Sequence, residues 1–466
     1  SASLPYISPA VLYRRLTARN GSEGSILLES SMAQAATSRY SFILIKPYAV
    51  FTSKNRKCSM HRGNTRKIYS EDPLGCLDRL VKREASVRYA GLPPFAGGPA
   101  GFLSYELKDV IEKRRFRTAD PFNLPDMYLG FYDKVIAIDH RLRKTKVIIS
   151  TTFHNSRPLE QAYKQTKAVL RLYSSEVAGA IRGGGRDDRK EFSLGSEKRV
   201  TGKNDFMKMV RKAKRYIRQG DIFQANLSHC LTFSFSGDPY QVYLRQRKLN
   251  PTSFAAYADF GVYQIISASP ERLLQSDGKR VSTRPIAGTR PRSDNAKKDR
   301  RLASELSLSE KERAEHVMLL DLERNDLGRV CEYGSVKVDE LMTIERYSHV
   351  QHIVSNVSGR LKKNITAVDL IRAVVPGGTI TGAPKVSAMQ IIDRLEGRNR
   401  GIYTGSIGYI SYCGRCEWNI VIRTMLIQKN KGYLQVGAGI VSDSDASKEY
   451  DETIHKAVSF LKMLRS

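Results

Sequence analysis

The order of predicted strands and helices most constrains the fold of this chain. Short strands occur in runs, for example within residues 38–53 and 133–151, and amphipathic helices such as residues 159–177 follow them at irregular intervals. A regular alternation of one strand and one helix would predict a parallel sheet with helices on both faces. Because the strands do not alternate with helices in that way, the sequence predicts an α+β fold.

A change in composition indicates how the chain divides. A chain of 466 residues can bury a large core and usually forms about two or three domains. Residues 181–199 are rich in glycine and in charge, which is typical of a linker or an exposed loop. We therefore expect an N-terminal region, residues 1–180, and a second region, residues 200–466.

Composition excludes several classes of protein. No run approaches the roughly 18 apolar residues of a membrane helix, and the first residues lack the apolar core of a signal peptide. Of six scattered cysteines, only Cys413 and Cys416 form a C-x-x-C pair, which fits a turn between two strands better than a zinc site. We expect a cytoplasmic protein without disulfides.

The net charge of +30 is unusual for a globular protein. It would suit a basic scaffold that binds nucleic acid, and we keep that function as a distant alternative. However, 47 acidic residues are interleaved with the basic ones, and no zinc-finger, helix-turn-helix or RNP pattern is present. A solvated basic surface that attracts a small dianion fits the sequence better.

Two proline- and glycine-containing segments predict rigid loops. The segment "STRPIAGTRPR" (282–292) cannot be a helix, and only its first residues fit a strand. The segment "PGGTITGAPK" (376–385) predicts a tight loop before a helix. Its amides could bind an anion at the helix N-terminus, although a plain helix start is the alternative.

Acidic pairs occur on two predicted helices. Glu312 and Glu315 share one helix face, and Glu449, Glu452 and Lys456 share a face of the last helix. Pairs of carboxylates suit a Mg²⁺ ion that keeps several waters, but each pair alone also fits a solvated surface.

Two further residues have alternative interpretations. Arg423 stands among apolar residues and needs an acidic partner, either inside the protein or on a substrate. His352 could be a buried histidine of the core or part of a site. From the residues alone we expect an α+β enzyme that binds a carboxylate-rich small molecule through magnesium.

Eight ordered segments give a more specific indication. They are "PIAGTRPR", "KERAEHVMLLDLERNDLGRV", "GSVKV", "ERYSHVQHIVSNV", "PGGTITGAPK", "YTGSIGYIS", "IRTM" and "GAGIVSDS". Together they resemble the chorismate-utilising enzymes, which include anthranilate, aminodeoxychorismate, isochorismate and salicylate synthases. The resemblance is dense over residues 200–466 and thinner before them. It implies two antiparallel sheets in a sandwich with surrounding helices, and an active site between the sheets.

The resemblance also assigns roles to individual residues. It implies Mg²⁺ on Glu315 and Glu452, with Glu312 and Glu449 acting through water. It implies that substrate is bound by Gly288, Thr289, Tyr403, Arg423, Gly437, Ala438 and Gly439. The catalytic positions that it implies are Gln224, Ala287, His352, Thr379 and Lys456, with His352 taking part in proton transfer during pyruvate loss.

Position 224 indicates which reaction the chain performs. Members that add water to chorismate carry a lysine base there, whereas glutamine cannot deprotonate water, so ammonia is the expected nucleophile. Asn226, "SPERLL", "GYISYCG" and "WNIVIRT" resemble aminodeoxychorismate synthase component I, of the p-aminobenzoate and folate pathway. Some members of that group carry a nucleophilic lysine where this chain has Ala287. Anthranilate synthase component I, of the tryptophan pathway, therefore stays open as the alternative.

The resemblance extends to a regulatory pocket and to a partner. "LLES", which contains Leu28, Glu29 and Ser30, matches half of the tryptophan pocket of the family. Ser253 and Phe254 replace a Pro-Tyr pair in the other half, which makes tryptophan inhibition doubtful. Because the chain contains no glutaminase domain, we expect ammonia from a glutamine amidotransferase subunit or from free ammonium.

Overall fold

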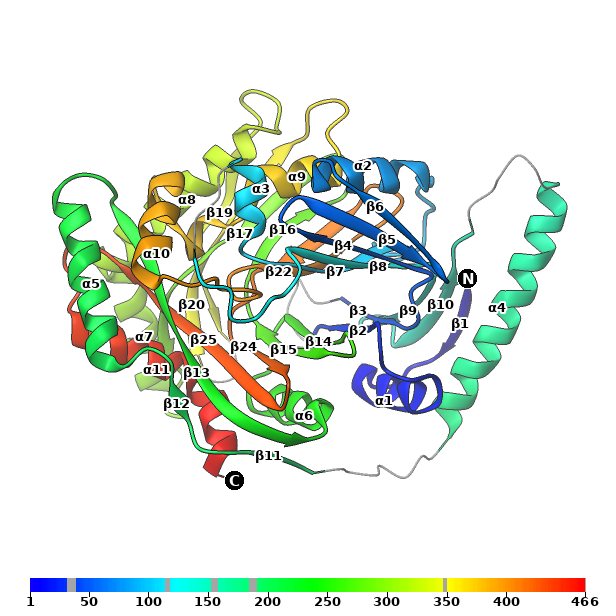
Figure 1. Cartoon of the computed structure of the whole chain (residues 1–466), viewed down its shortest axis with the longest axis horizontal. Helices are drawn as coiled ribbons and strands as arrows, with labels where there is room; N and C mark the ends of the chain where they lie inside the picture. The colour runs from blue at the N-terminus through cyan, green and yellow to red at the C-terminus, as the bar shows by residue number, and fades with distance from the viewer. Residues whose placement is uncertain (32–38, 114–117, 152–157, 184–190, 347–349, 466) are drawn as a thin grey trace.

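A computed structural model describes residues 1–31, 39–113, 118–151, 158–183, 191–346 and 350–465. Two large sheets lie one above the other, and helices cover their outer faces (Figure 1). All strand pairs in the described residues of both sheets are antiparallel. The predicted α+β fold with two antiparallel sheets is confirmed.

The first sheet contains 13 described strands and combines both ends of the chain. Its order is β1 (Ala2–Pro5), β10 (Lys144–Ile149), β9 (Lys134–Asp139), β3 (Tyr40–Leu44), β2 (Ser25–Glu29), β14 (Phe254–Asp259), β15 (Tyr263–Ser269), β24 (Thr424–Gln428), β25 (Lys431–Ile440), β13 (Gln224–Gly237) and β11 (Phe192–Leu194). The short strands β12 (Lys198–Arg199) and β21 (Gly382–Ala383) also pair with β13.

The second sheet contains 12 described strands. Its order is β18 (Ile286–Pro291), β20 (Val350–Arg360), β17 (Arg280–Arg284), β16 (Arg272–Ser276), β23 (Cys416–Asn419), β22 (Ser406–Ile410), β7 (Gly98–Leu103), β8 (Met127–Tyr132), β4 (Ala49–Lys54), β5 (Lys57–Arg62) and β6 (Thr65–Tyr69), with β19 (Lys337–Arg346) paired to β20. Strands from both predicted regions therefore occur in both sheets, and the proposed boundary between the regions stays a prediction.

Helices cover the outer faces of the sheets. They are α1 (Pro9–Asn20), α2 (Pro73–Arg83), α3 (Leu107–Ile111), α4 (Leu159–Arg182), α5 (Lys203–Arg218), α6 (Pro239–Leu249), α7 (Ala296–Leu308), α8 (Glu310–Gly328), α9 (Ala367–Val374), α10 (Lys385–Glu396) and α11 (Ala446–Leu461), with 3₁₀ turns η1 (Gly378–Ile380) and η2 (Lys462–Arg465). No helix in the described ranges is both long and apolar enough to cross a bilayer.

Alternation along the strands divides the apolar side chains among separate layers. On β3, Phe42 and Leu44 belong to the core between the sheets, where they join Phe102 of β7. The intervening Ile43 belongs instead to the layer beneath α1, α4, α6 and α11. A third layer lies under α2, α8 and α9, and a fourth packs α5 and α10 against β13 and β25. The inter-sheet core therefore fixes the two sheets that carry the candidate site.

Two local predictions need correction. The segment 282–292 is mostly strand, because β17 includes its first residues and β18 begins at Ile286. The sheet accepts Pro291 because β18 is at the edge of the sheet, where a missing N–H is tolerated. The expected linker, residues 181–199, includes the end of α4 and the strands β11 and β12, while residues 184–190 lie outside the description.

Candidate active site

The strand pair β13–β25 forms one wall of the candidate site. A Cβ atom added at Gly437 would lie 2.8 Å from the Tyr403 hydroxyl, and one added at Gly439 would lie 2.6 Å from the Gln224 amide nitrogen. Ala438, between the two glycines, is buried in the layer under α5 and α10, so it contributes only its backbone to the wall. Glycine thus lets Tyr403 and Gln224 approach the backbone of β25.

Two amide side chains at the start of β13 have buried oxygens without a partner. Gln224 Oε1 and Asn226 Oδ1 accept no hydrogen bond from any described residue. A buried acceptor left in this state costs about 1–3 kcal/mol. Gln224 is 6% exposed, so bulk water reaches it poorly. Both oxygens are therefore suited to accept N–H or O–H bonds from a bound molecule.

His352 lies in the second sheet, on β20, and is buried. Its Nδ1 atom is 3.2 Å from the carbonyl oxygen of Gly288 and 2.9 Å from the hydroxyl of Thr289. Because a carbonyl only accepts, Nδ1 carries the proton in the bond to Gly288. Burial and the positive charges of Arg423 and Lys456 lower the pKa of His352 to about 3. The imidazole is therefore neutral at physiological pH.

Glu271, which the sequence interpretation overlooked, is a buried carboxyl beside this site. It is buried between β15 and β16, and the amide N–H of Ile286 donates to its Oε1 over 3.4 Å. Burial raises the pKa of Glu271 to about 7, although the Thr379 hydroxyl and the charges of Arg423 and Lys456 oppose the rise. At neutral pH a large fraction of this carboxyl is protonated, so it can donate a proton.

Two cations act on both of these groups. Arg423 lies between β23 and β24, at the crossing from one sheet to the other, and is half-buried rather than enclosed. Lys456 of α11 donates to the carbonyl of Gly437 over 3.0 Å and pairs with Glu452 over 2.8 Å. Since each cation influences the pKa of both Glu271 and His352, the structure brings these groups into one cluster.

A bulge in β18 borders this cluster. The register with β20 shifts between Ala287 and Thr289, so Gly288 is the extra residue, with φ of +62°. A Cβ at Gly288 would lie 2.7 Å from the carboxylate of Glu312, so glycine permits the close approach of α8. Ala287 is opposite Ile353, next to His352 in the sequence, and offers no nucleophile.

The four predicted metal ligands lie on two helices. On α8, Glu312 is held by Arg290 at 3.2 Å, and Glu315 is half-buried one turn further along. On α11, Glu449 is 6% exposed and accepts a 2.7 Å hydrogen bond from Ser444, whereas the carboxylate of Glu452 is half-exposed. Glu449 is thus buried. The alternative that its helical spacing left open, a position on a solvated helix surface, does not apply to this residue.

These carboxylates fit a magnesium ion by their chemistry. Mg²⁺ prefers oxygen ligands and is commonly held by one or two protein carboxylates, with waters and substrate oxygens completing its shell. In the described ranges no three His, Cys, Asp or Glu side chains gather as a metal-binding group. Direct ligation of Mg²⁺ by Glu315 and Glu452, with Glu312 and Glu449 acting through water, stays a prediction.

The residues that resemble half of a tryptophan pocket line a separate cavity. Its volume is about 330 Å³, and Leu28, Glu29, Ser30, Ser253 and Phe254 are all in its walls. The carboxylate of Glu29 is fully buried and is held by Arg247 at 2.7 Å. The sequence interpretation therefore selected residues that are far apart in the chain and close together in the fold.

Comparison with known proteins identifies the family of this chain. The family described as chorismate binding enzyme matches residues 8–462, so the chain belongs to the chorismate-binding enzyme family. It is therefore a chorismate-utilising enzyme.

Individual relatives come from two branches of this family. The aminodeoxychorismate synthase component 1 of Bacillus subtilis (strain 168) is 42% identical over 94% of this chain and 91% of the relative. The anthranilate synthase component 1 of Aquifex aeolicus is 39% identical over 94% of this chain and 89% of the relative. The solved structure of anthranilate synthase component I from Streptococcus pneumoniae TIGR4 has a TM-score of 0.78, with 34% identity, over 91% of this chain and 92% of that chain.

Proposed function

We propose that this chain uses ammonia to aminate chorismate at ring carbon 4 and forms 4-amino-4-deoxychorismate, the precursor of p-aminobenzoate in folate synthesis. The observation that carries the choice of ammonia over water is the Gln224 amide at the wall of the site, where water-adding relatives have a lysine base. An amide cannot deprotonate water, whereas its buried oxygen can accept an N–H bond from ammonia. The relative at 42% identity supports this branch of the family.

The binding step follows from the charges of the site. Chorismate carries two carboxylates, and Arg423 with the backbone amides of residues 437–439 would hold the enolpyruvyl carboxylate. Lys456 adds positive charge at the same strand through its bond to Gly437. A Mg²⁺ ion on Glu315 and Glu452 would supply neutralisation of the second, ring carboxylate.

The chemical step needs an acid, which Glu271 supplies. Its carboxyl donates a proton to the hydroxyl on carbon 4, and the hydroxyl leaves as water. Ammonia forms the new carbon–nitrogen bond and gives one proton back to the Glu271 carboxylate, so the net change is the replacement of hydroxyl by amine. Because Ala287 cannot form a covalent intermediate, ammonia adds to the ring directly.

The proposal includes a source of ammonia and a location. A glutamine amidotransferase subunit would deliver ammonia, and free ammonium salts would replace it in the test tube. All six cysteines are free thiols, which fits a reducing cytoplasm. The cavity at Glu29, which Ser253 and Phe254 also line, is where tryptophan would bind.

Anthranilate synthesis is the second candidate. The absence of a nucleophile at Ala287 favours it, as do the relative at 39% identity and the solved structure with a TM-score of 0.78. In that reaction ammonia bonds to ring carbon 2 and pyruvate leaves, with neutral His352 as the group for proton transfer. A nucleic-acid-binding scaffold has no observation in its favour beyond net charge.

A product assay separates these functions. The protein is incubated with chorismate, Mg²⁺ and ammonium at alkaline pH, and the products are resolved by chromatography. Conversion to p-aminobenzoate after addition of a purified aminodeoxychorismate lyase supports the proposal. Fluorescent anthranilate in the absence of the lyase supports the second candidate, and unconsumed chorismate contradicts both.

A further inference from the structure

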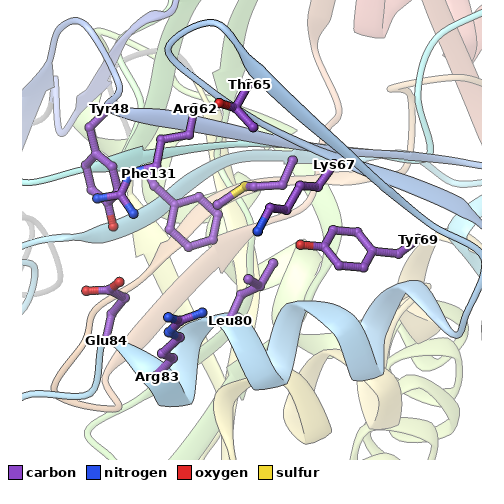
Figure 2. A pocket seen from close by; sticks show the side chains of 10 residues that line it. Tyr48, Arg62, Thr65, Lys67, Tyr69, Leu80, Arg83, Glu84 and Phe131 are labelled. Atoms are coloured by element: carbon purple, nitrogen blue, oxygen red, sulfur yellow. The ribbon is translucent and has the colours of Figure 1, made fainter.

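A second cavity, of about 350 Å³, lies between α2 and the β5–β6 hairpin (Figure 2). None of its lining residues belongs to the candidate active site or to the cavity at Glu29. Its volume is in the range of small-molecule sites, which are roughly 300–1,000 Å³. Besides the hairpin and α2, Phe131 of β8 and Tyr48, just before β4, line the cavity, so a molecule within it would contact the sheet, the hairpin and the helix.

The cavity has an excess of positive charge. Three cationic side chains line it, Arg62 and Lys67 from the hairpin and Arg83 from the end of α2, against the single carboxylate of Glu84. Three positive charges and one negative charge leave a net charge of +2. None of the three cations is paired with a carboxylate anywhere in the described residues. An anion would relieve their mutual repulsion.

The rest of the lining is apolar and aromatic. Leu80 and Phe131 form part of the floor, and Figure 2 shows the Lys67 amine and the Tyr69 hydroxyl directed over them. Leu80 and Tyr69 are only partly buried, so apolar surface stays open to water in the cavity. A planar apolar group would cover that surface, and the binding free energy gained would be proportional to the apolar area removed from water.

The aromatic wall is held in a fixed position. The hydroxyl of Tyr48 forms a hydrogen bond with the hydroxyl of Tyr412, and the Arg62 guanidinium lies over the Tyr48 ring, 5.4 Å from its centroid. A guanidinium that stacks on a ring can still direct its N–H groups at an anion. Arg62 is therefore placed for contact with a charged group beside an aromatic surface.

We propose that this cavity is a binding site for a small aromatic dianion, a planar ring that carries either a phosphate or two carboxylates. The ring covers the partly exposed apolar floor at Leu80, Met60 and Tyr69, and the negative groups contact Lys67 and Arg83. Two negative charges match the excess of +2, and the partly exposed apolar floor explains why a ring is needed in addition to charge. The site is independent of the chorismate site, so the proposal does not depend on the proposed function.

The experiment measures binding to the full chain by fluorine NMR titration. The probes are 4-fluorophenyl phosphate and 4-fluorophthalate, which distinguish the phosphate from the dicarboxylate. Inorganic phosphate, as a competitor, tests charge without a ring, and 4-fluorophenol tests a ring without charge. We expect at least one dianionic probe to bind, phosphate to compete at least about tenfold more weakly, and 4-fluorophenol to bind at least about tenfold more weakly.

Variants locate the binding. Lys67→Gln and Arg83→Gln should each lower the affinity for the dianionic probe by about tenfold, because each removes a charge-assisted hydrogen bond. Arg66→Gln is the matched control, since Arg66 adjoins Lys67 on β6 but does not line the cavity, and it should change affinity less than about twofold. All three residues are exposed, so the variants should fold.

Several results would overturn the proposal. It is wrong if neither dianionic probe binds, or if Lys67→Gln and Arg83→Gln bind as tightly as Arg66→Gln. It is also wrong if Arg423→Gln, and not the cavity variants, removes the binding, because the probe then occupies the chorismate site. Equal affinity for inorganic phosphate, or for 4-fluorophenol, would contradict the requirement for both a ring and charge.

Discussion

Replacement of Glu271 by glutamine should raise the free energy of unfolding relative to that of the parent protein. This gain should be larger at neutral pH than at acidic pH. Burial raises the pKa of Glu271 from 4.5 to about 7 in the folded chain. Between these two values the unfolded chain has released this proton and the folded chain still holds it. The parent protein therefore loses stability as the pH rises through this interval, whereas glutamine, which does not ionise, avoids the loss.

The size of the effect follows from the shift in pKa. One pKa unit corresponds to about 1.4 kcal/mol, so the Glu271 carboxyl costs on the order of 3 kcal/mol of folding free energy above pH 7. This cost is absent below pH 4.5, where the carboxyl is protonated in both states. The free energy of unfolding of Glu271→Gln minus that of the parent should therefore rise by about 3 kcal/mol across this interval and stay constant above it.

Urea denaturation of both proteins at several pH values between 4.5 and 8.5 measures this difference. Glu323→Gln is a useful companion, because burial and the nearby charge of Asp326 raise the pKa of Glu323 to about 8. Its difference from the parent should likewise rise with pH, because the folded chain holds this proton above the pH at which the unfolded chain releases it. A difference for Glu271→Gln that is independent of pH, or that falls as pH rises, would refute the assignment of Glu271 as a buried acid.

Three further predictions concern the reaction. Gly439→Ala should lower kcat/KM by about tenfold, because the new Cβ would lie 2.6 Å from Gln224 Nε2 and displace that amide. Steady-state kinetics with chorismate measure this, and an unchanged kcat/KM would contradict it. Glu452→Gln should lower turnover by about a hundredfold at fixed Mg²⁺, and parent-like turnover across a magnesium titration would remove Glu452 from the metal site. Ala287→Lys should form a covalent adduct with chorismate that is visible by mass spectrometry, and a pocket of the aminodeoxychorismate type is contradicted if no adduct forms.

Much of the fold could be predicted because local patterns agree with the tertiary structure. The helix predicted over 159–177 is α4, which continues to Arg182. The segment 282–292 was predicted to be mostly loop, which is wrong. Its two prolines exclude a strand only from the interior of a sheet, not from its edge. Its place at an edge, and the bulge at Gly288, depend on pairing with β20, which is more than 60 residues further along the chain.

The candidate site was only partly visible in the sequence. Residues in motifs of strong local constraint, such as Gly437 and Gly439, could be selected because glycine in a strand indicates a close approach. Glu271 was overlooked because a single glutamate in "SPERLL" has no partner at a helical spacing. Its altered pKa arises from burial between β15 and β16, together with Thr379 and Arg423, which are more than 100 residues away. A carboxylate directly beside apolar strands was the available signal.

The position of the new nitrogen on the ring distinguishes the two aminating reactions. The protein would convert chorismate in the presence of Mg²⁺ and ammonium labelled with heavy nitrogen, and NMR of the product would locate the label. We expect the label on ring carbon 4, with the enolpyruvyl group still attached. A label on ring carbon 2, accompanied by released pyruvate, would contradict it and would identify the chain as an anthranilate-forming member of the family.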